Sequence, residues 1–516
     1  MSDQPPDDEL GGHAEAPKRI LDLAVMLFES TQAQHALDDE SQEVLESAAL
    51  LRNTPLPRSK MKSAQADLAL VFTQAGLNLS EQGRRELAAV LAYQQGKLKR
   101  KDFAGFGLTP PQERETLTIA AILEIAESLD HLGRGAARIQ KIEPADDGLW
   151  IVVAGLDDPD DAAAVQKKSR LWEKLGYPRV EILEPGQAAL RRLPFPEPLE
   201  KIGIQRDDTL AEAGRKVMRF QFAQMLRHEE GTRAGEDIEA LHDMRVATRR
   251  LRAAFEVFGD SFEPGVLKPH LKGLRRTGHL LGAVRDLDVF MEKAYRYIET
   301  LPEDRRNGLD PLLESWRSQR DAARALMLEY LNSREYYRFK RDFNIFLNTP
   351  LAGERPLPDD RVVPHLVNQL VPALIYERIA AVRAYGSLLE DAPIERLHAL
   401  RIEFKKLRYT VEYFREVLGK RAFDVIESIK KLQDHLGDLT DAQVATQILR
   451  EFVDSWEESQ RTRSIHEREN IEEVFNYLSA RYAERHQLLI AFPSAWQEHF
   501  HTRAFRRNVA QAVSVL

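Results

Sequence analysis

Two short segments of this 516-residue chain carry the same pattern of histidine, arginine and lysine. The first runs from Leu241 to Arg252 and reads Leu-His-Asp-Met-Arg-Val-Ala-Thr-Arg-Arg-Leu-Arg. The second runs from Leu397 to Arg408, 156 residues further on, and reads Leu-His-Ala-Leu-Arg-Ile-Glu-Phe-Lys-Lys-Leu-Arg. Arginine guanidinium groups match phosphate oxygens bidentately, and lysine adds a point charge. The pattern therefore indicates binding of an anion that carries many phosphates.

Helical geometry places the cationic side chains of each segment on one face. At 100° per residue, the four cations of a segment fall within about 80° of one another, and the apolar residues cluster on the opposite side. Each stripe is about 15 Å long at 1.5 Å per residue. The predicted phosphate ligands are His242, Arg245, Arg249 and Arg252 in the first segment and His398, Arg401, Lys405 and Arg408 in the second.

A second matched pair follows the first in the same order. Leu274-Arg275-Arg276 corresponds to Ile429-Lys430-Lys431, at an offset of 155 residues. Two matches at nearly the same separation indicate duplication of a unit of about 150 residues. We expect Arg275 and Arg276, and likewise Lys430 and Lys431, to extend each stripe into a patch.

A solvated charged face is the alternative interpretation of these stripes. Against it, Arg245 with Arg249 and Arg401 with Lys405 are like charges at i,i+4, which cost an isolated helix a few tenths of a kcal/mol each. For other basic residues the solvated face remains the favoured interpretation. These weaker candidates are Arg215, Lys216, Arg219, Arg227, Arg378 and Arg383.

The elements that position the stripes are mainly helices, so the predicted fold class is mainly all-α. Residues 1–16 form an acidic tail, and residues 17–187 form a helical domain with a small strand-helix-strand appendage at 148–183. Residues 188–204 contain prolines at 194, 196 and 198 and are expected to form a linker. Residues 205–516 form the duplicated region, with halves 205–350 and 360–516.

Composition limits the classes of function. The net charge is −9, divided as −10 over residues 1–200 and +1 over residues 201–516, so an anion site must be a local cluster. The chain contains no cysteine, and no window approaches the roughly 18 consecutive apolar residues of a membrane span. We expect a soluble cytoplasmic protein that does not bind membranes.

The repeated segment resembles the signature of the CHAD family, the conserved histidine α-helical domain: histidine, arginine three residues later, and a basic run that ends in Leu-Arg. The resemblance spans about residues 205–516. It implies two four-helix bundles related by pseudo-twofold symmetry, inorganic polyphosphate bound in a basic central channel, and association with polyphosphate granules. The twelve predicted ligands would line that channel.

The N-terminal region, about residues 17–187, is similar to the HD-like helical domain at the C-terminus of the exopolyphosphatase and guanosine-pentaphosphate phosphohydrolase (Ppx/GppA) family. The segments that carry this similarity begin at Leu45, Ile122 and Gly148. Arg52 and Asn53 stand where the HD family has its metal-binding histidine and aspartate, and neither suits a hard divalent cation. The resemblance therefore implies binding without metal-dependent catalysis, and we expect no enzyme activity, no metal and no cofactor.

Three alternatives remain open. The chain could be a phosphohydrolase that acts on polyphosphate or a phosphorylated nucleotide, although no P-loop or nucleophile elbow is present. The histidines at 242, 279, 398 and 435 could bind a metal, although the neighbouring cations oppose it. Nucleic acid shares the phosphate chemistry but usually requires interleaved aromatic residues, so no specific nucleic-acid binding is expected. Proteins of polyphosphate metabolism are further candidate partners.

Overall fold

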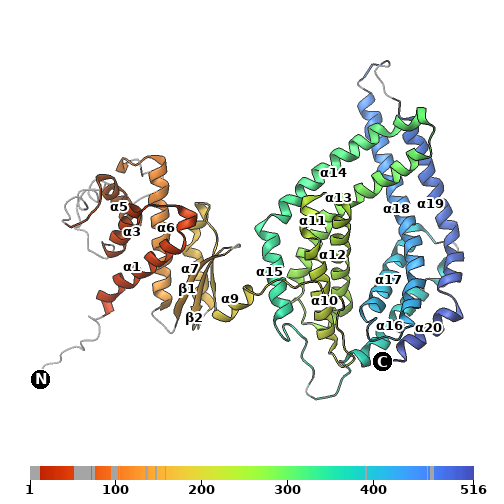
Figure 1. The fold of residues 1–516 in the computed structure, drawn as a ribbon, viewed down its shortest axis with the longest axis horizontal. Helices are drawn as coiled ribbons and strands as arrows, with labels where there is room; N and C mark the ends of the chain where they lie inside the picture. Colours follow the sequence, from red (N-terminus) through yellow and green to blue (C-terminus); the bar gives the residue numbers. More distant parts are fainter. Residues whose placement is uncertain are drawn as a thin grey trace. The chain divides into compact units, whose positions relative to one another are not determined.

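The chain folds into two compact units, Met1–Leu193 and Pro194–Leu516. The computed structural model describes residues 12–51, 71, 76–94, 103, 105–133, 137–145, 148–156, 159–358, 360–389, 392–461, 463–464, 466 and 470–516. The protein is mainly helical, with one small three-stranded sheet (Figure 1). Among the helices described, none combines the length and the apolar character needed to cross a membrane.

The first unit is built around the apolar helix α6 (Pro110–Gly133). The other helices described in this unit are α1 (Gly12–Ser30), α2 (Gln32–His35), α3 (Asp39–Leu51), α5 (Glu81–Gln94), α7 (Pro159–Lys168), α8 (Arg170–Lys174) and α9 (Pro185–Arg191). The stretch from Ile119 to Ala126 on α6 is almost fully apolar and lies in the core of this unit. A helix that is apolar on most of its circumference must be covered on several sides.

The sheet has three strands where the sequence predicted two. β1 (Arg138–Ala145) pairs antiparallel with β2 (Gly148–Ala154), which pairs parallel with β3 (Val180–Leu183). Leu149 of β2 contributes to the main core of the unit, while Trp150 packs with Ala188 of α9 on the other face. Burial of β2 on both faces explains its continuous apolar run. The sequence did not predict β1 because many of its residues are charged and exposed, so it lacks the alternation of apolar and polar residues that marks a strand.

The residues that bear on HD-type chemistry lie only partly within the described region. Arg52 and Asn53 are outside it, so their predicted replacement of a metal dyad stays a prediction. Asp130 is buried and accepts a hydrogen bond from Arg19 Nε at 2.8 Å. This carboxylate therefore takes part in the packing of the first unit.

The proline-rich segment differs from a simple linker. Its first residues, 188–191, complete helix α9, residues 192–193 still belong to the first unit, and residues 194–204 belong to the second unit. Asn344 donates to the carbonyl of Pro194 at 3.2 Å, and the ring of Phe195 packs against Phe222 at 6.2 Å between centroids. Farther along, the backbone N–H groups of residues 202–204 all point to one carboxylate, that of Glu416. Residues 194–204 thus form a strap on the surface of the second unit.

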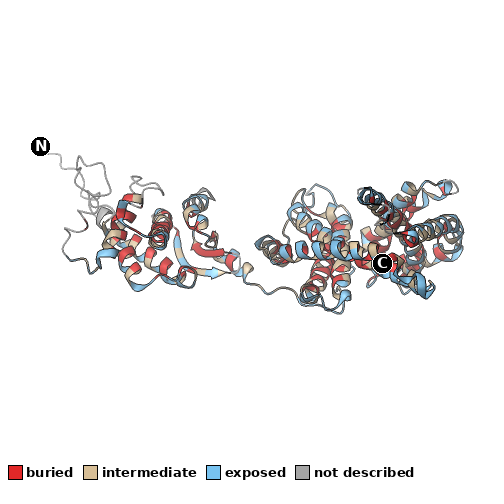
Figure 2. Cartoon of the chain, turned by 90° about the horizontal axis from the view of Figure 1, so that it is seen from above, coloured by how far each residue is buried: buried red, intermediate tan, exposed pale blue. Residues whose placement is uncertain are grey.

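The second unit consists of two sets of helices. The first set contains α10 (Leu210–Arg227), α11 (Glu229–Ala234), α12 (Ile238–Phe258), α13 (Lys268–Glu299), α14 (Asp310–Leu331) and α15 (Arg334–Asn348). The second contains α16 (Val367–Arg383), α17 (Ile394–Tyr413), α18 (Ala422–Gln460), α19 (Glu472–His499) and α20 (Arg503–Val513). The two copies of the repeated segment lie in α12 and α17, and the second matched pair lies in α13 and α18. The inward faces of these helices are buried (Figure 2).

Two apolar junctions join the sets of helices at separate places. At one, Phe258 at the end of α12 packs against Phe414 at 5.5 Å between ring centroids, and the hydroxyl of Tyr413 donates to the Arg250 carbonyl at 2.5 Å. The other junction is a separate core formed by α13, α14, α18 and α19, in which the rings of Tyr297 and Tyr477 lie 4.8 Å apart. Figure 1 shows α13 and α14 reaching across to α18 and α19 at that second place. The polar faces of α12 and α17 lie between the two junctions.

Candidate functional site

Helix α12 presents one core face and one cationic face. The side chain of Asp237 caps its start by accepting a hydrogen bond from the backbone N–H of Glu239 at 2.9 Å. Met244, Leu251 and Phe258 are fully buried. Because these residues fix which side of the helix faces the core, the arginines on the other side are turned toward the second set of helices.

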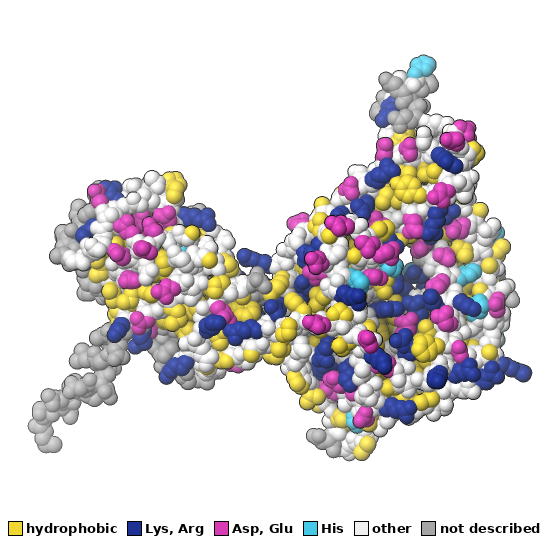
Figure 3. Space-filling view, viewed as in Figure 1, with side chains coloured by type: hydrophobic (Ala, Val, Ile, Leu, Met, Phe, Trp, Pro, Cys, Tyr) yellow, Lys and Arg dark blue, Asp and Glu magenta, His cyan; other side chains and the backbone are white. Residues whose placement is uncertain are grey.

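Helix α17 repeats this arrangement from the second set. Leu400, Phe404 and Leu407 are fully buried, and the ring of Phe404 packs edge-on against Phe500 at 5.4 Å between centroids. The cationic side of α17 is thereby turned toward α12. Figure 3 shows Lys and Arg side chains gathered between the two sets of helices.

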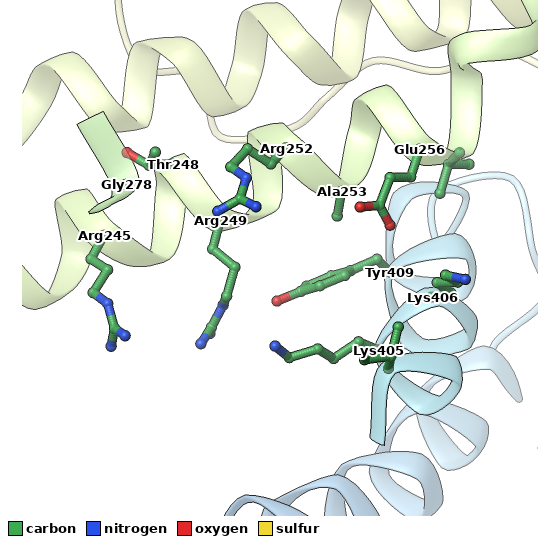
Figure 4. Close-up of a pocket in the computed structure, with 12 residues that line it drawn as sticks. Arg245, Thr248, Arg249, Arg252, Ala253, Glu256, Gly278, Lys405, Lys406 and Tyr409 are labelled. Atoms are coloured by element: carbon green, nitrogen blue, oxygen red, sulfur yellow. The ribbon is translucent and has the colours of Figure 1, made fainter. Parts of the chain in front are cut away.

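A pocket of about 380 Å³ lies between α12, α13 and α17 (Figure 4). Its basic lining residues are Arg245, Arg249, Arg252, Lys405 and Lys406. Its remaining lining residues are Thr248, Ala253, Glu256, Val257, Gly278, Ile402 and Tyr409. The pocket therefore collects cations from both copies of the repeated segment.

Two glycines of α13 allow the arginines of α12 to lie along it. A Cβ atom at Gly278 would lie 3.6 Å from Nη1 of Arg252, and one at Gly282 would lie 3.7 Å from Nε of Arg245. These are ordinary van der Waals distances, so the two arginines already lie in close contact with the surface of α13 at these glycines. Gly278 also lines the pocket itself.

The charged side chains in and beside the pocket are partly shielded from water. Burial, and after it the positive charges of Arg401 and Arg249, lower the pKa of Lys405 to about 8. Burial also lowers the pKa of Arg401, an effect that the carboxylate of Asp441 opposes. Like charges gathered away from water repel one another and favour the arrival of an anion.

Few acids neutralise these cations. Arg245 donates to Asp286 at 2.8 Å, and Lys406 donates to Glu403 at 2.8 Å. Arg249 and Lys405, in contrast, form no ion pair within the described part of the chain, and Nε of Arg249 is buried there without a hydrogen-bond partner. These two side chains are the cations best placed to meet a ligand.

Two of the predicted phosphate ligands, Arg408 and Arg276, contact other side chains and lie outside the pocket lining. Nε of Arg408 lies 3.1 Å from Oε1 of Glu412, and the Arg408 guanidinium lies over the ring of Tyr409 at 5.2 Å. Arg276 pairs with Glu335 and lies over the ring of Tyr330 at 4.8 Å. These contacts of Arg408 are within α17, whereas those of Arg276 join α13 to α14 and α15, and neither guanidinium lines the pocket.

The other predicted ligands lie outside the pocket lining. Arg275, His398, Lys430 and Lys431 are exposed. His242 is half-buried, and burial, followed by the nearby Arg285, lowers its pKa. Of the twelve predicted residues, the structure therefore brings four into the pocket, namely Arg245, Arg249, Arg252 and Lys405, and places Arg401 beside it.

Tyr409 is the main residue that the sequence reasoning missed. It is 2% exposed, yet it lines the pocket. Its position four residues after Lys405 places both side chains on the same face of α17, so helical spacing alone could have indicated it. An aromatic residue on a cationic stripe was overlooked because the search considered only charged residues and histidines.

The weaker basic candidates on α10 do not lie on a solvated face. Arg215 is 1% exposed and donates from two nitrogens to the carbonyl of Ala352 at 3.1 Å. Lys216 pairs with Asp208 at 2.7 Å, and Arg219 donates to the carbonyl of Leu347. That interpretation was wrong for these three residues, because their polar groups hold the ends of neighbouring segments together.

Metal binding gains no support from the histidines. His435 makes a hydrogen bond with the carbonyl of Leu488 at 2.7 Å and packs against Phe492. Within the described ranges, no group of three or more His, Asp or Glu side chains is placed to hold a metal ion.

Comparison with known proteins relates this region to one family. Residues 216–450 match the model of the CHAD domain. Uncharacterized proteins from two strains of Mycobacterium tuberculosis are each 25% identical to the chain over 249 residues. The matched region covers 46% of this chain and 45% of each relative, so the chain spans less than half the length of these relatives.

Two solved structures are also similar. The crystal structure of the CHAD domain from the plant Ricinus communis is 23% identical, with a TM-score of 0.46, over 58% of this chain and 96% of that one. PptA from Streptomyces chartreusis is 15% identical, with a TM-score of 0.42, over 56% of this chain and 100% of that one. The family match does not extend into residues 1–193, where the HD-like resemblance stays a prediction. The chain thus contains a CHAD domain over residues 216–450.

Proposed function

We propose that the chain binds inorganic polyphosphate between the facing cationic sides of α12 and α17. One observation carries the proposal. Lys405 lies in a pocket with three arginines of the other copy of the repeated segment, and it forms no ion pair within the described residues. Guanidinium and ammonium groups arranged in this way match closely spaced phosphate oxygens. The CHAD domain is also a family linked to polyphosphate binding.

A chain of phosphates fits better than a single phosphate. The basic residues continue from Arg245 to Arg252 along α12 and from Arg401 to Lys405 along α17, so a linear polyanion would meet several of them in succession. We infer that the duplicated segments belong to two four-helix bundles with pseudo-twofold symmetry, and that this symmetry makes the two stripes face each other.

The first test uses Arg249 and Lys405, one cation from each copy of the repeated segment, neither of which forms an ion pair within the described residues. Arg249→Gln and Lys405→Gln should each lower affinity for polyphosphate about tenfold, and each should lower the slope of log affinity against log salt by about one, because each removes one phosphate contact. Fluorescence titration at several salt concentrations measures both quantities.

Lys430→Gln and Lys431→Gln serve as matched controls, since they remove the same charges from exposed positions outside the pocket. Equal losses in the control and pocket variants would contradict a localised site and would indicate attraction to net charge alone. Absence of binding by the unaltered protein would overturn the proposed function itself.

We further propose that the chain binds polyphosphate without cutting it. Five of the twelve lining residues are basic, and Glu256 is the one carboxylate among the described lining residues. Release of phosphate from polyphosphate in the presence of Mg²⁺ or Mn²⁺, at a turnover typical of enzymes, would favour the phosphohydrolase alternative. Competition at matched phosphate and salt concentration separates polyphosphate from DNA, and we expect polyphosphate to displace DNA.

The remaining parts of the proposal concern the rest of the chain and its place in the cell. An HD-like origin of the N-terminal unit is consistent with its helical core around α6, and the buried Asp130 with its arginine partner suits a packing role better than a metal site. Association with polyphosphate granules would follow from binding the polymer. Microscopy of the labelled protein in cells that store polyphosphate would test it.

A further inference from the structure

Tyr409 carries a hydroxyl group that the protein itself leaves without a hydrogen-bond partner. The side chain is 2% exposed, and its oxygen is buried with no partner among the described residues. Buried hydroxyl groups in native proteins are nearly always paired, because an unpaired one loses its hydrogen bonds to water and gains nothing in return. The Tyr409 hydroxyl is therefore an exception that calls for an explanation.

The neighbours of this hydroxyl group explain why it is unpaired. It points toward the guanidinium of Arg249, with the Lys405 ammonium beside it (Figure 4). Arginine and lysine carry only hydrogen-bond donors, so neither can accept the phenolic hydrogen. The carboxylate of Glu256 lies near the other end of the ring, away from the hydroxyl (Figure 4). What this corner of the pocket lacks is an acceptor oxygen.

The ring that holds the hydroxyl group is fixed in place. It stacks on the ring of Tyr413 at 6.0 Å between centroids and 13° between planes, and the Arg408 guanidinium covers it at 5.2 Å. A donor held this firmly is already oriented and loses little freedom when an acceptor arrives.

We propose that Tyr409 is a direct ligand of the bound phosphate chain, donating its phenolic hydrogen to a phosphate oxygen held between Arg249 and Lys405. The inference rests on the proposed function and adds to it a hydrogen bond from an uncharged side chain. A phosphate oxygen supplies the acceptor that the surrounding cations cannot provide, and it satisfies all three groups at once. The duplication did not create this contact, because the matching position in the first copy is Ala253.

The experiment compares Tyr409→Phe with Tyr413→Phe. Tyr409→Phe should lower affinity for polyphosphate about tenfold, as expected for a hydrogen bond to a charged group. Since no charge is removed, the slope of log affinity against log salt should stay that of the unaltered protein, in contrast to Arg249→Gln. The melting temperature of the ligand-free protein should stay the same or rise, because the hydroxyl has no partner to lose.

Tyr413→Phe is the matched control. Its hydroxyl is paired within the protein and lies outside the pocket lining, so this change should lower the melting temperature and leave the affinity unchanged. Unchanged or higher affinity of Tyr409→Phe would overturn the inference, and so would an affinity loss accompanied by a lower melting temperature or a lower salt slope. If the unaltered protein binds polyphosphate, any of these results contradicts only the role of Tyr409, whereas failure of that protein to bind contradicts the proposed function.

Discussion

At the scale of single residues, the site depends on cations that the protein does not neutralise. Arg249 and Lys405 come from different copies of the repeat and meet in one pocket. Arg408 and Arg276 have the same residue type and arise from the same motifs, yet Glu412 and Glu335 pair with them. Whether an arginine serves the ligand or the fold is thus decided by its neighbours.

The pH dependence of binding is a prediction at this scale. The pKa of Lys405 is about 8 in the folded protein, below its ordinary value of 10.5. A bound polyanion favours the protonated amine, so affinity should fall as pH rises through about 8, and binding near that pH should take up protons. Titration calorimetry in buffers with different ionisation enthalpies measures the uptake. Lys405→Arg should abolish this pH dependence between pH 7 and 9, and its persistence in that variant would contradict the assignment.

The same shift affects the stability of the ligand-free protein. Between pH 8 and 10.5 the unfolded chain holds more protons on this lysine than the folded one. The contribution of Lys405 to stability therefore rises with pH across that window. Ligand binding and stability should respond to pH in opposite directions there.

At the scale of elements, the strap of residues 194–204 connects the beginning of the second unit to the end of α17. The carboxylate of Glu416 accepts hydrogen bonds from the backbone N–H groups of Ile202 and Gly203, both at 2.7 Å, and of Ile204 at 3.2 Å. These residues are more than 200 positions apart in the sequence. A single carboxylate thus holds the C-terminal end of the strap, while Asn344 and Phe222 contact its beginning.

Removal of this carboxylate should loosen the strap. We expect Glu416→Ala to destabilise the second unit by about 1 kcal/mol, because three charge-assisted hydrogen bonds are lost at a solvent-exposed place. Hydrogen exchange at the amides of residues 202–204 should become faster, and mass spectrometry can follow it. Glu427→Ala, which removes an exposed carboxylate from α18, is the control. Equal protection of these amides in both variants would argue against the role of Glu416.

At the scale of the whole molecule, the pocket belongs to the second unit alone. All of its lining residues fall between Arg245 and Tyr409, and the two apolar junctions of that unit hold α12 and α17 apart at a fixed spacing. The first unit has its own core around α6 and β2. Stability and binding should therefore be separable between the units.

Two core truncations test this separation. Phe258→Ala removes a fully buried ring from the junction of α12 and α17 and should cost the second unit about 3–5 kcal/mol together with most of the polyphosphate affinity. Trp172→Ala removes a ring that is 1% exposed in the first unit and should destabilise that unit comparably while leaving the affinity unchanged. Calorimetric melting combined with titration distinguishes the two effects. Loss of binding in Trp172→Ala with the second unit intact would show that the first unit contributes to the site.

The sequence by itself determined the mainly helical class and the repeated basic segment with its cationic face, because helical spacing and repetition are local properties of the chain. It missed β1, whose side chains are mostly polar, and it treated the strap as a free linker.

Only the tertiary structure decided which cations meet. The ion pair with Glu335 of α15 removes Arg276 of α13 from its stripe, and no pattern within one helix reveals such a partner on another. The pair of Arg408 with Glu412, in contrast, lies within α17 at i,i+4, so helical spacing could indicate it. The pairing of α12 with α17 brings Arg249, Lys405 and Tyr409 together from positions 156 to 160 residues apart. The desolvation that makes these groups sensitive to an anion exists only when the two sets of helices are packed, because it comes from the exclusion of water by both of them.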